Sequence, residues 1–270
     1  MTHAAGHLIR TWRHRRGVSQ LELAHRAQVS ARHVSFVETG RSRPTVEMVL
    51  RLCDHLTVPL REQNQVLLAA GHAPAHPEHP LDSPPMEQVS AAIDGILTAH
   101  LPYPALVVDR RWDLVAANDA LYALLDGLPG HVLEPPVNVI RLSMAPDGLA
   151  PRIENLDQWR GHLVHRLRRE LDVSADPDLE VLLSELGELP PSVAGEPLPL
   201  LVPLRLRVGD EVLSLVSTTT VFGTPHEVTL SELAIESFYP SDDTTRRFLL
   251  QGQPPSTGSP SSAGGTSVRR

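Results

Sequence analysis

Residues 18–44 carry the start, turn and stop signals of two consecutive short helices. Ser19 followed by Glu22 forms a capping box, which satisfies backbone N–H groups that a helix start leaves without partners. Ser30 can cap a second helix, and Gly40 suits the left-handed position that follows a helix end. The spacing predicts a helix-turn-helix.

The second of these helices has two faces of different character. At about 100° per residue, Val34 and Val37 point one way, while Arg32, Ser35 and Phe36 cluster on the other side. The first helix has an apolar side made by Leu21, Leu23, Ala24 and Ala27. We therefore expect the valine face to be buried and the arginine face to be free to enter a major groove.

Three short motifs carry a family resemblance: Val18-Ser19-Gln20, Glu38-Thr39-Gly40 and Arg43-Pro44. With them the segment resembles the Xre/Cro class of phage-repressor-type regulators. The resemblance implies an all-α, five-helix, lambda-repressor-like DNA-binding domain over residues 4–72, with double-stranded DNA as its partner.

The resemblance also implies which side chains meet DNA. Arg32 is the candidate for reading sequence, since a guanidinium can donate to both N7 and O6 of guanine. Phe36 stands where a polar residue is often found, and a phenyl ring can read only apolar features such as a thymine methyl. Arg41 and Arg43 suit phosphate contacts, which hold register without reading sequence. The implied DNA-binding residues are Gln20, Ser30, Ala31, Arg32, Ser35, Phe36, Arg41 and Arg43.

Arg13 and Glu38 carry opposite charges at positions that bridge the first and third helices in the resembled family. We expect an ion pair there that supports the fold. Neither side chain is expected to touch DNA.

Charge is divided unevenly along the chain. Up to His72 there are ten arginines and five acidic residues, a balance of +5, whereas the rest carries −13 and brings the net charge to −8. A basic first quarter fits phosphate neutralisation, and the acidic remainder should face away from DNA.

Cysteine content and hydropathy favour a cytoplasmic protein. The one cysteine, Cys53, lies on an apolar helical face and cannot form a disulfide within the chain. No run approaches the roughly 20 apolar residues that a membrane span requires, and the N-terminus lacks a signal-peptide block. No membrane partner is expected.

A length of 270 residues predicts about two domains. Residues 73–85 are proline-rich and lack periodicity, which is typical of a stiff linker. The histidines in and beside this linker lack carboxylate or cysteine partners, so no metal site and no cofactor are expected. The second domain should span residues 86–252, followed by a disordered tail over residues 253–270.

The second domain has the order of elements of an α+β fold with an antiparallel sheet. Expected strands are residues 104–108, 112–116, 202–208, 211–222 and 233–239, and expected helices are 86–100, 118–125, 137–144, 155–171 and 176–187. Thr229 followed by Glu232 leaves a helix open as an alternative to the last strand. The order of strand, turn, strand and Asn118-capped helix resembles PAS-type sensor domains.

Motifs throughout the chain together are similar to Xre-type regulators that carry an MmyB-like, PAS-like ligand-binding domain. They are Arg32-His-Val-Ser-Phe-Val-Glu-Thr-Gly-Arg41, Leu67-Leu-Ala-Ala-Gly71, Pro102-Tyr-Pro-Ala105, Pro135-Pro-Val-Asn-Val139, Leu149-Ala-Pro-Arg152 and Ser217-Thr-Thr-Thr-Val-Phe-Gly-Thr-Pro225. The resemblance implies a transcription regulator whose second domain senses an apolar, fatty-acid-like molecule.

A pocket for such a molecule would lie between the sheet and its helices. A fatty carboxylate would need a partner such as Arg141 or Arg152, because an unpaired charge is costly in an apolar site. The expected lining is Leu106, Val108, Trp112, Leu114, Val139, Leu142, Trp159, Leu215 and Phe222. For any single one of these side chains, a place in the ordinary core is the favoured interpretation.

Two other functions compete with a ligand-responsive regulator. An enzyme would have to use the hydroxyls of Ser217–Thr220 or scattered histidines, and no nucleophile elbow, phosphate loop or metal pair accompanies them. Alternatively, the second domain docks a protein partner, in which case its core would be filled. A cavity of a few hundred Å³ would favour ligand sensing. One helix-turn-helix per chain favours a homodimer, with two recognition helices in successive major grooves.

Overall fold

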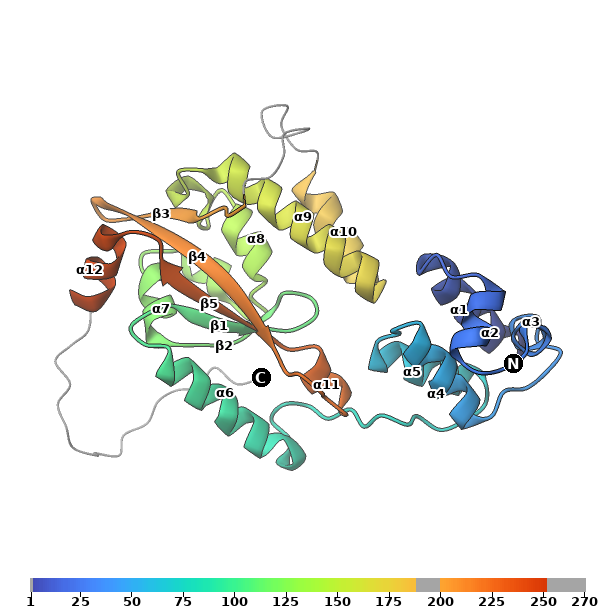
Figure 1. The fold of residues 1–270 in the computed structure, drawn as a ribbon. Coiled ribbons are helices and arrows are strands. Elements are labelled where there is room, and N and C mark those ends of the chain that lie inside the picture. The colour runs from blue at the N-terminus through green and yellow to red at the C-terminus, as the bar shows by residue number, and fades with distance from the viewer. Residues whose placement is uncertain (1, 188–199, 252–270) are drawn as a thin grey trace. The chain divides into compact units, whose positions relative to one another are not determined.

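The computed structural model describes residues 2–187 and 200–251. It divides the chain into two compact units (Figure 1). The first unit runs to His79 and also includes Thr224–Ser231, whereas the second consists of Pro80–Gly223 and the residues from Glu232 onward. The expected disordered tail, residues 253–270, lies outside the described residues. The sequence did not indicate that a segment between two late strands belongs with the first unit.

Up to His79, the described residues of the first unit form five α-helices. These are α1 (Thr2–Arg15), α2 (Gln20–Arg26), α3 (Ala31–Glu38), α4 (Val46–His55) and α5 (Leu60–Ala69). The predicted caps are present, since the Ser19 hydroxyl accepts from the Glu22 N–H at 3.1 Å and the Ser30 hydroxyl accepts from the His33 N–H at 3.1 Å. The predicted all-α, five-helix domain is confirmed.

Helix α3 ends at the glycine that the sequence indicated. Gly40 has a φ of +70°, its N–H donates to the Val37 carbonyl at 3.0 Å, and the Arg41 N–H donates to the Phe36 carbonyl at 2.8 Å. These two bonds form a Schellman motif, which satisfies the last carbonyls of the helix. The motif fixes Arg41 directly beside the end of α3.

The first part of the stretch expected to be a linker, residues 73–79, is folded into the first unit. The Asn64 carbonyl oxygen on α5 accepts from the N–H groups of Ala75 and His76 at 3.0 and 3.1 Å, and the Asn64 amide donates to the His76 carbonyl at 2.8 Å. The His76 ring contacts Gln63 Oε1 at 3.0 Å. A side-chain amide thus holds the proline-rich chain by its backbone, a tertiary contact that composition does not reveal.

The second unit is built on a five-stranded antiparallel sheet with the order β2-β1-β5-β4-β3. The strands are β1 (Ala105–Val108), β2 (Leu114–Ala117), β3 (Leu204–Val208), β4 (Glu211–Val221) and β5 (Ala234–Pro240). All five predicted strands are present, although β2 begins two residues later than expected because Trp112 belongs to the preceding turn. The predicted α+β class with an antiparallel sheet is confirmed.

The last strand was predicted correctly, and the capping-box alternative at Thr229 and Glu232 was wrong. A four-residue helix, α11 (Val228–Ser231), precedes β5. Its cap is Glu227, whose carboxylate accepts from the Leu230 N–H at 2.6 Å.

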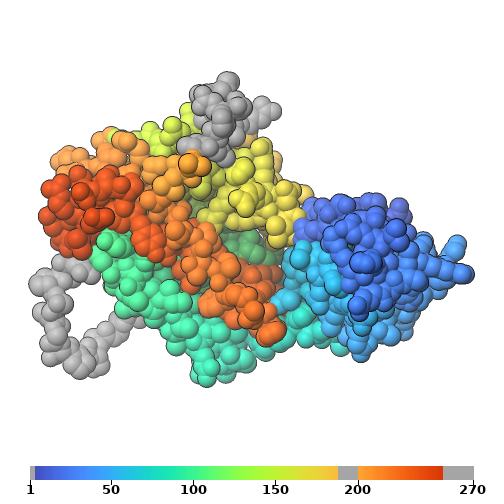
Figure 2. Space-filling model, in the orientation of Figure 1, coloured from blue at the N-terminus to red at the C-terminus, as the bar shows by residue number. Residues whose placement is uncertain are grey.

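Helices cover both faces of the sheet (Figure 1). They are α6 (Glu87–Ala99), α7 (Asp119–Leu125), α8 (Val139–Met144), α9 (Leu156–Ser174), α10 (Pro177–Leu186) and α12 (Asp243–Gln251), with short 3-10 turns at Pro84–Met86, Gly130–Leu133 and Ala150–Arg152. Because strand residues alternate between faces, Leu106 and Val108 join the main core with α7 to α10, while Val107 between them faces the α6 side. In Figure 2, α12 lies against β4, where the Thr245 hydroxyl accepts from the Ser214 N–H at 2.8 Å.

None of the helices within residues 2–187 and 200–251 has the length and apolar character needed to cross a membrane.

Candidate DNA-binding face and apolar cavity

Helix α3 turns one face into the first unit and the other outward, as its sequence predicts. Val34 and Val37 are fully buried, Arg32 is exposed, and Ser35 and Phe36 are half-buried. This leaves a surface of one arginine and one aromatic ring on a helix that a Schellman motif terminates sharply.

Phe36 supports two guanidinium groups on this face. The Arg32 guanidinium carbon lies 5.1 Å from the centroid of the Phe36 ring, and that of Arg41 lies 5.9 Å from it. Both distances are within the range of a cation–π interaction. Among the described residues, neither guanidinium has an ion pair or hydrogen bond with another side chain, so both charges are available to a phosphate or a base edge.

Behind this face, Arg13 and Glu38 join α1 to α3 through a buried ion pair. Arg13 Nε donates to Glu38 Oε1 at 2.6 Å, and Arg13 Nη2 donates to Oε2 at 2.9 Å. The Gln20 amide donates to the same Oε2 at 2.8 Å. Burial by itself would raise the pKa of the Glu38 carboxyl, but the hydrogen bonds from Arg13 and Gln20 outweigh burial and lower that pKa. The pair holds the recognition helix on the domain, as expected.

The second unit contains a cavity of about 80 Å³ between the sheet and its helices. Its wall is mostly leucine, valine, isoleucine and aromatic side chains. The polar or charged side chains that reach it, apart from tryptophan N–H groups, are Ser143, Arg166, Ser217 and Glu236.

An ion pair forms the polar part of this wall. Arg166 Nη1 and Nη2 donate to Glu236 Oε2 and Oε1 at 2.8 and 2.5 Å, and Arg166 Nε donates to Glu170 at 3.0 Å. Burial opposes the charge of the Arg166 guanidinium, yet its bonds to Glu236 and Glu170 raise the pKa above the ordinary value. The Arg166 guanidinium therefore keeps its charge in this buried position.

Trp112 connects this pair to the apolar wall. Its backbone adopts a φ of +66°, which is uncommon for a bulky residue and places it in the turn before β2. Its indole N–H donates to Glu170 at 2.9 Å, and the Arg166 guanidinium lies 4.3 Å from the ring centroid. These contacts hold the indole against the cavity despite the cost of the backbone conformation.

Residues 89–251, more than half of the chain, match the family described as MmyB-like transcription regulator ligand binding domain. The chain belongs to the MmyB-like transcription regulators. Residues 4–65 of this MmyB-like regulator match a helix-turn-helix domain. It is accordingly a DNA-binding transcription regulator with a ligand-binding domain, as the sequence motifs implied.

Solved structures that are similar to part of this MmyB-like regulator include a bacterial gene regulator. The clp gene regulator ClgR from Corynebacterium glutamicum is 24% identical to it, with a TM-score of 0.23 over 36% of this chain and 87% of the ClgR chain. A comparison with curated proteins gives no match.

Seven of the side chains expected to line a pocket do line the cavity of this MmyB-like regulator. They are Leu106, Trp112, Leu114, Val139, Leu142, Trp159 and Leu215. Val108 is buried in the same core without reaching the cavity. Sequence reasoning missed Arg166 and Glu236, since on a helix and a strand they resemble ordinary surface charges.

Three expected pocket residues lie elsewhere, which corrects the prediction. Arg141 is exposed on α8 and pairs with Glu185 at 2.7 Å. Arg152 donates to backbone carbonyls outside the cavity, one of them that of Arg207 at 3.1 Å. Phe222 lies just beyond the end of β4 and does not line the cavity. Strand side chains alternate between faces, and Phe222 is separated from the inward-facing Leu215 by an odd number of positions, so it would lie on the opposite face.

Two of the implied DNA-binding residues are occupied within the first unit. Arg43 Nε donates to the Ala70 carbonyl at 3.0 Å and Nη2 to the Gly71 carbonyl at 2.9 Å, so the guanidinium caps the end of α5. The Gln20 amide nitrogen is engaged by Glu38. Arg43 was expected to contact a phosphate, but in the structure its guanidinium has a structural role at the end of α5.

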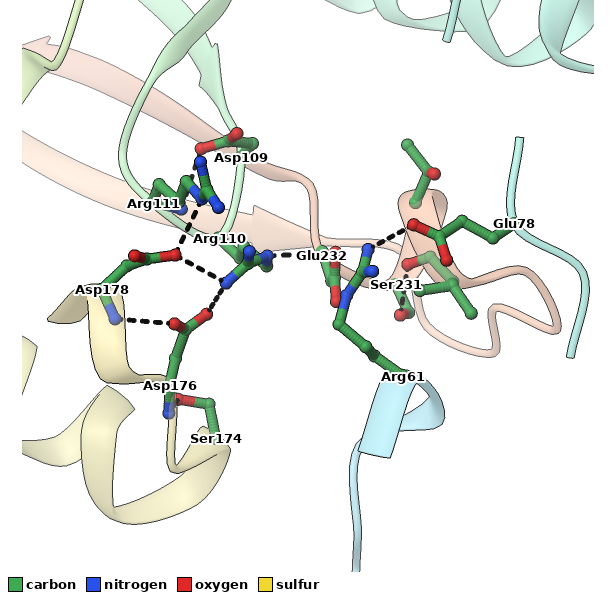
Figure 3. A network of polar contacts seen from close by, with 12 residues as sticks. Arg61, Glu78, Asp109, Arg110, Arg111, Ser174, Asp176, Asp178, Ser231 and Glu232 are labelled. Carbon is green, nitrogen blue, oxygen red and sulfur yellow. Dashed lines mark hydrogen bonds and ion pairs between the residues drawn. The ribbon is translucent and has the colours of Figure 1, made fainter. Parts of the chain in front are cut away.

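An acidic cluster around Arg110 fixes the turn between β1 and β2 (Figure 3). Arg110 pairs with Asp176, the N-cap of α10, and with Asp178 at 3.1 Å. In the first unit, the same figure shows the pair between Arg61 and Glu78, 2.7 Å apart. Within the described residues, no group of His, Cys, Asp and Glu side chains is arranged to hold a metal ion.

Proposed function

We propose that this regulator binds DNA as a cytoplasmic homodimer and that an apolar small molecule in the cavity of its second unit controls binding. The observation that carries the proposal is the cavity itself, whose apolar wall contains one paired charge. Such a wall suits a ligand with an apolar body and one polar end, which is the fatty-acid-like class suggested by the family resemblance.

In the proposed complex, α3 enters the major groove. Arg32 reads a base edge, Arg41 contacts a phosphate, and Ser30, Ala31 and Ser35 lie at the groove. Phe36 positions the two arginines rather than reading a base alone. Two such helices in a dimer would meet half-sites roughly 34 Å apart.

The route from ligand to DNA runs, we propose, through the segment Thr224–Ser231. Strands β4 and β5 both contribute to the cavity wall, through Ser217 and Glu236 among others. The segment that joins these strands belongs to the first unit. A ligand that shifts the ends of β4 and β5 would therefore move a part of the first unit.

Hydrogen bonds within the first unit anchor this segment. The Val228 N–H donates to the Pro77 carbonyl at 2.9 Å. The His79 N–H donates to Glu227 at 2.7 Å, and the Thr229 hydroxyl donates to the His79 carbonyl at 2.7 Å. The segment Thr224–Ser231 is thus hydrogen-bonded to residues 77–79, which directly precede the second unit. A displacement of the segment would therefore be passed to these residues.

A protein-docking second domain remains the alternative, favoured by the small size of the cavity. About 80 Å³ is less than the few hundred Å³ expected for a roomy ligand site. A ligand of more than a few heavy atoms would have to displace leucine side chains.

Native mass spectrometry of the full chain, purified without detergent, tests ligand binding directly. We expect an added mass that leaves on denaturation, and we expect the extracted compound to change the affinity of the protein for its operator DNA. The full chain is needed because a fragment beginning at residue 80 would separate Thr224–Ser231 from its partners. A bare protein whose DNA binding is unaffected by apolar compounds would favour protein docking.

Glu227→Gln combined with Thr229→Val tests the transmission route. We expect this variant to bind ligand and DNA separately but to lose the effect of ligand on DNA affinity. Glu211→Gln, which changes an exposed carboxylate at the start of β4, is the matched control and should retain that effect. An unchanged response in the double variant would rule out this segment as the route.

A further inference from the structure

We propose that the cavity selects apolar molecules whose polar end is an uncharged oxygen acceptor, such as a ketone, ester or alcohol, over free carboxylates. This inference rests on the proposed function, since it concerns the ligand of the same cavity. It is carried by two features of the wall, the neutralised Arg166 and a buried indole N–H without an acceptor.

The positive charge at the cavity is already balanced. Both Nη atoms of Arg166 donate to Glu236, whose side chain is only 4% exposed, and Nε donates to Glu170. One guanidinium therefore stands between two carboxylates. A ligand carboxylate placed there would be a third, and like charges at close range in a poorly solvated site repel strongly.

No other fixed positive charge reaches the cavity among the described residues. Arg141 and Arg152, the partners that a fatty carboxylate would have used, lie outside the lining. An ionised acid would thus enter without a counter-ion, at the cost of its hydration.

Donors for a neutral oxygen are present. Each Nη of Arg166 has a second N–H beyond the one given to Glu236, because a guanidinium has five donors. Trp159 lines the cavity and is 5% exposed. Its indole Nε1 is buried and has no hydrogen-bond partner in the part of the chain that the structure describes.

The unpartnered indole N–H of Trp159 needs a hydrogen-bond acceptor, and that acceptor need not be charged. An indole N–H only donates, and leaving it buried without an acceptor costs about 1–3 kcal/mol. A ligand carbonyl or hydroxyl oxygen would restore that bond without adding charge beside Glu236. An ammonium end group would instead bring no acceptor for Trp159, and the carboxylates of Glu170 and Glu236 already accept hydrogen bonds from Arg166.

Isothermal titration calorimetry of the full chain with four eight-carbon probes tests the selection. We expect 2-octanone and 1-octanol to bind at least tenfold more tightly than octanoate and octylammonium. Tightest binding by octanoate or octylammonium would overturn the inference while leaving the proposed ligand site intact. Failure of all four probes, together with no copurified ligand, would overturn both.

Two variants separate the features of the wall. Trp159→Phe keeps an apolar ring without the N–H, so 2-octanone should lose several-fold in affinity, whereas the control Trp12→Phe on α1 should have no effect. Glu236→Gln removes one negative charge, so the preference for 2-octanone over octanoate should fall about tenfold. Unchanged ratios in both folded variants would contradict the assignment. The comparison of probes on the unaltered protein requires no variant and decides the inference even if a variant fails to fold.

Discussion

The guanidinium of Arg32 lies 5.1 Å from the centre of the Phe36 ring, one helical turn further along the exposed face of α3. Arg41, beyond the end of the helix, approaches the same ring. A base-reading role does not readily explain an aromatic residue at position 36. The ring of Phe36 instead serves as a platform that holds two arginine side chains.

Phe36→Leu should weaken DNA binding by about two- to fivefold, because leucine keeps apolar bulk but loses a cation–π interaction of roughly 0.5–1 kcal/mol. The dependence of affinity on salt should not change, since no charge is lost. Fluorescence anisotropy with operator DNA at several salt concentrations measures both quantities. Wild-type affinity in this variant would show that the ring does not position the arginines.

Arg43→Ala should lower stability by about 1 kcal/mol, because it leaves the carbonyls of Ala70 and Gly71 at the end of α5 without their donors. Arg41→Ala should instead leave stability unchanged and reduce the salt slope of DNA binding by about 0.9. Denaturant unfolding and salt titration of both variants check the contrast. A reduced slope in Arg43→Ala would restore its originally expected phosphate contact.

Gly6→Ala should destabilise the first unit by about 2 kcal/mol, although alanine favours helices. A Cβ at Gly6 would lie 2.3 Å from the Val37 carbonyl oxygen and 2.8 Å from that of Glu38, where backbone cannot yield easily. Gly95→Ala on α6 is the control, because nothing lies within 4 Å of its added Cβ, and it should stabilise by up to about 1 kcal/mol. Equal effects of the two substitutions on thermal unfolding would refute the close approach of α1 and α3.

Acid should loosen the attachment of α3. The pKa of Glu38 is lower in the folded state, so its pair with Arg13 stabilises fully above the unfolded pKa of roughly 4.3 and is lost as the pH falls through the folded value. Hydrogen exchange of the α3 amides, corrected for intrinsic rates, should speed up below about pH 4. In Glu38→Gln the exchange should already be faster at pH 7, with a weaker further change on acidification.

Cys53 should be inert to thiol reagents at pH 8 in the folded protein. It is 1% exposed, and burial raises the pKa of its thiol to about 12, so the reactive thiolate is scarce. Reaction with a chromogenic disulfide should follow unfolding in denaturant. Rapid modification of the native protein would mean that α4 opens readily.

Features that depend on local chemistry could be predicted from the order of the amino acids. Ser19, Ser30 and Gly40 specify helix ends through bonds to neighbouring backbone, so the helix-turn-helix could be predicted residue by residue. Alternating residues in β3 and β4 likewise indicated the sheet and its inward face, from which Leu204, Leu206 and Leu215 reach the cavity.

The pairing of charged side chains, by contrast, depends on how the chain folds. Arg166 and Glu236 lie 70 positions apart and pair across a helix and a strand. Arg43 reaches 27 residues along the chain to cap α5 instead of a phosphate. Asn64 fastens a proline-rich stretch that composition assigns to a linker. A charged or amide side chain can form its hydrogen bonds with water or with many different groups. Which group it bonds to therefore depends on the three-dimensional arrangement of the chain.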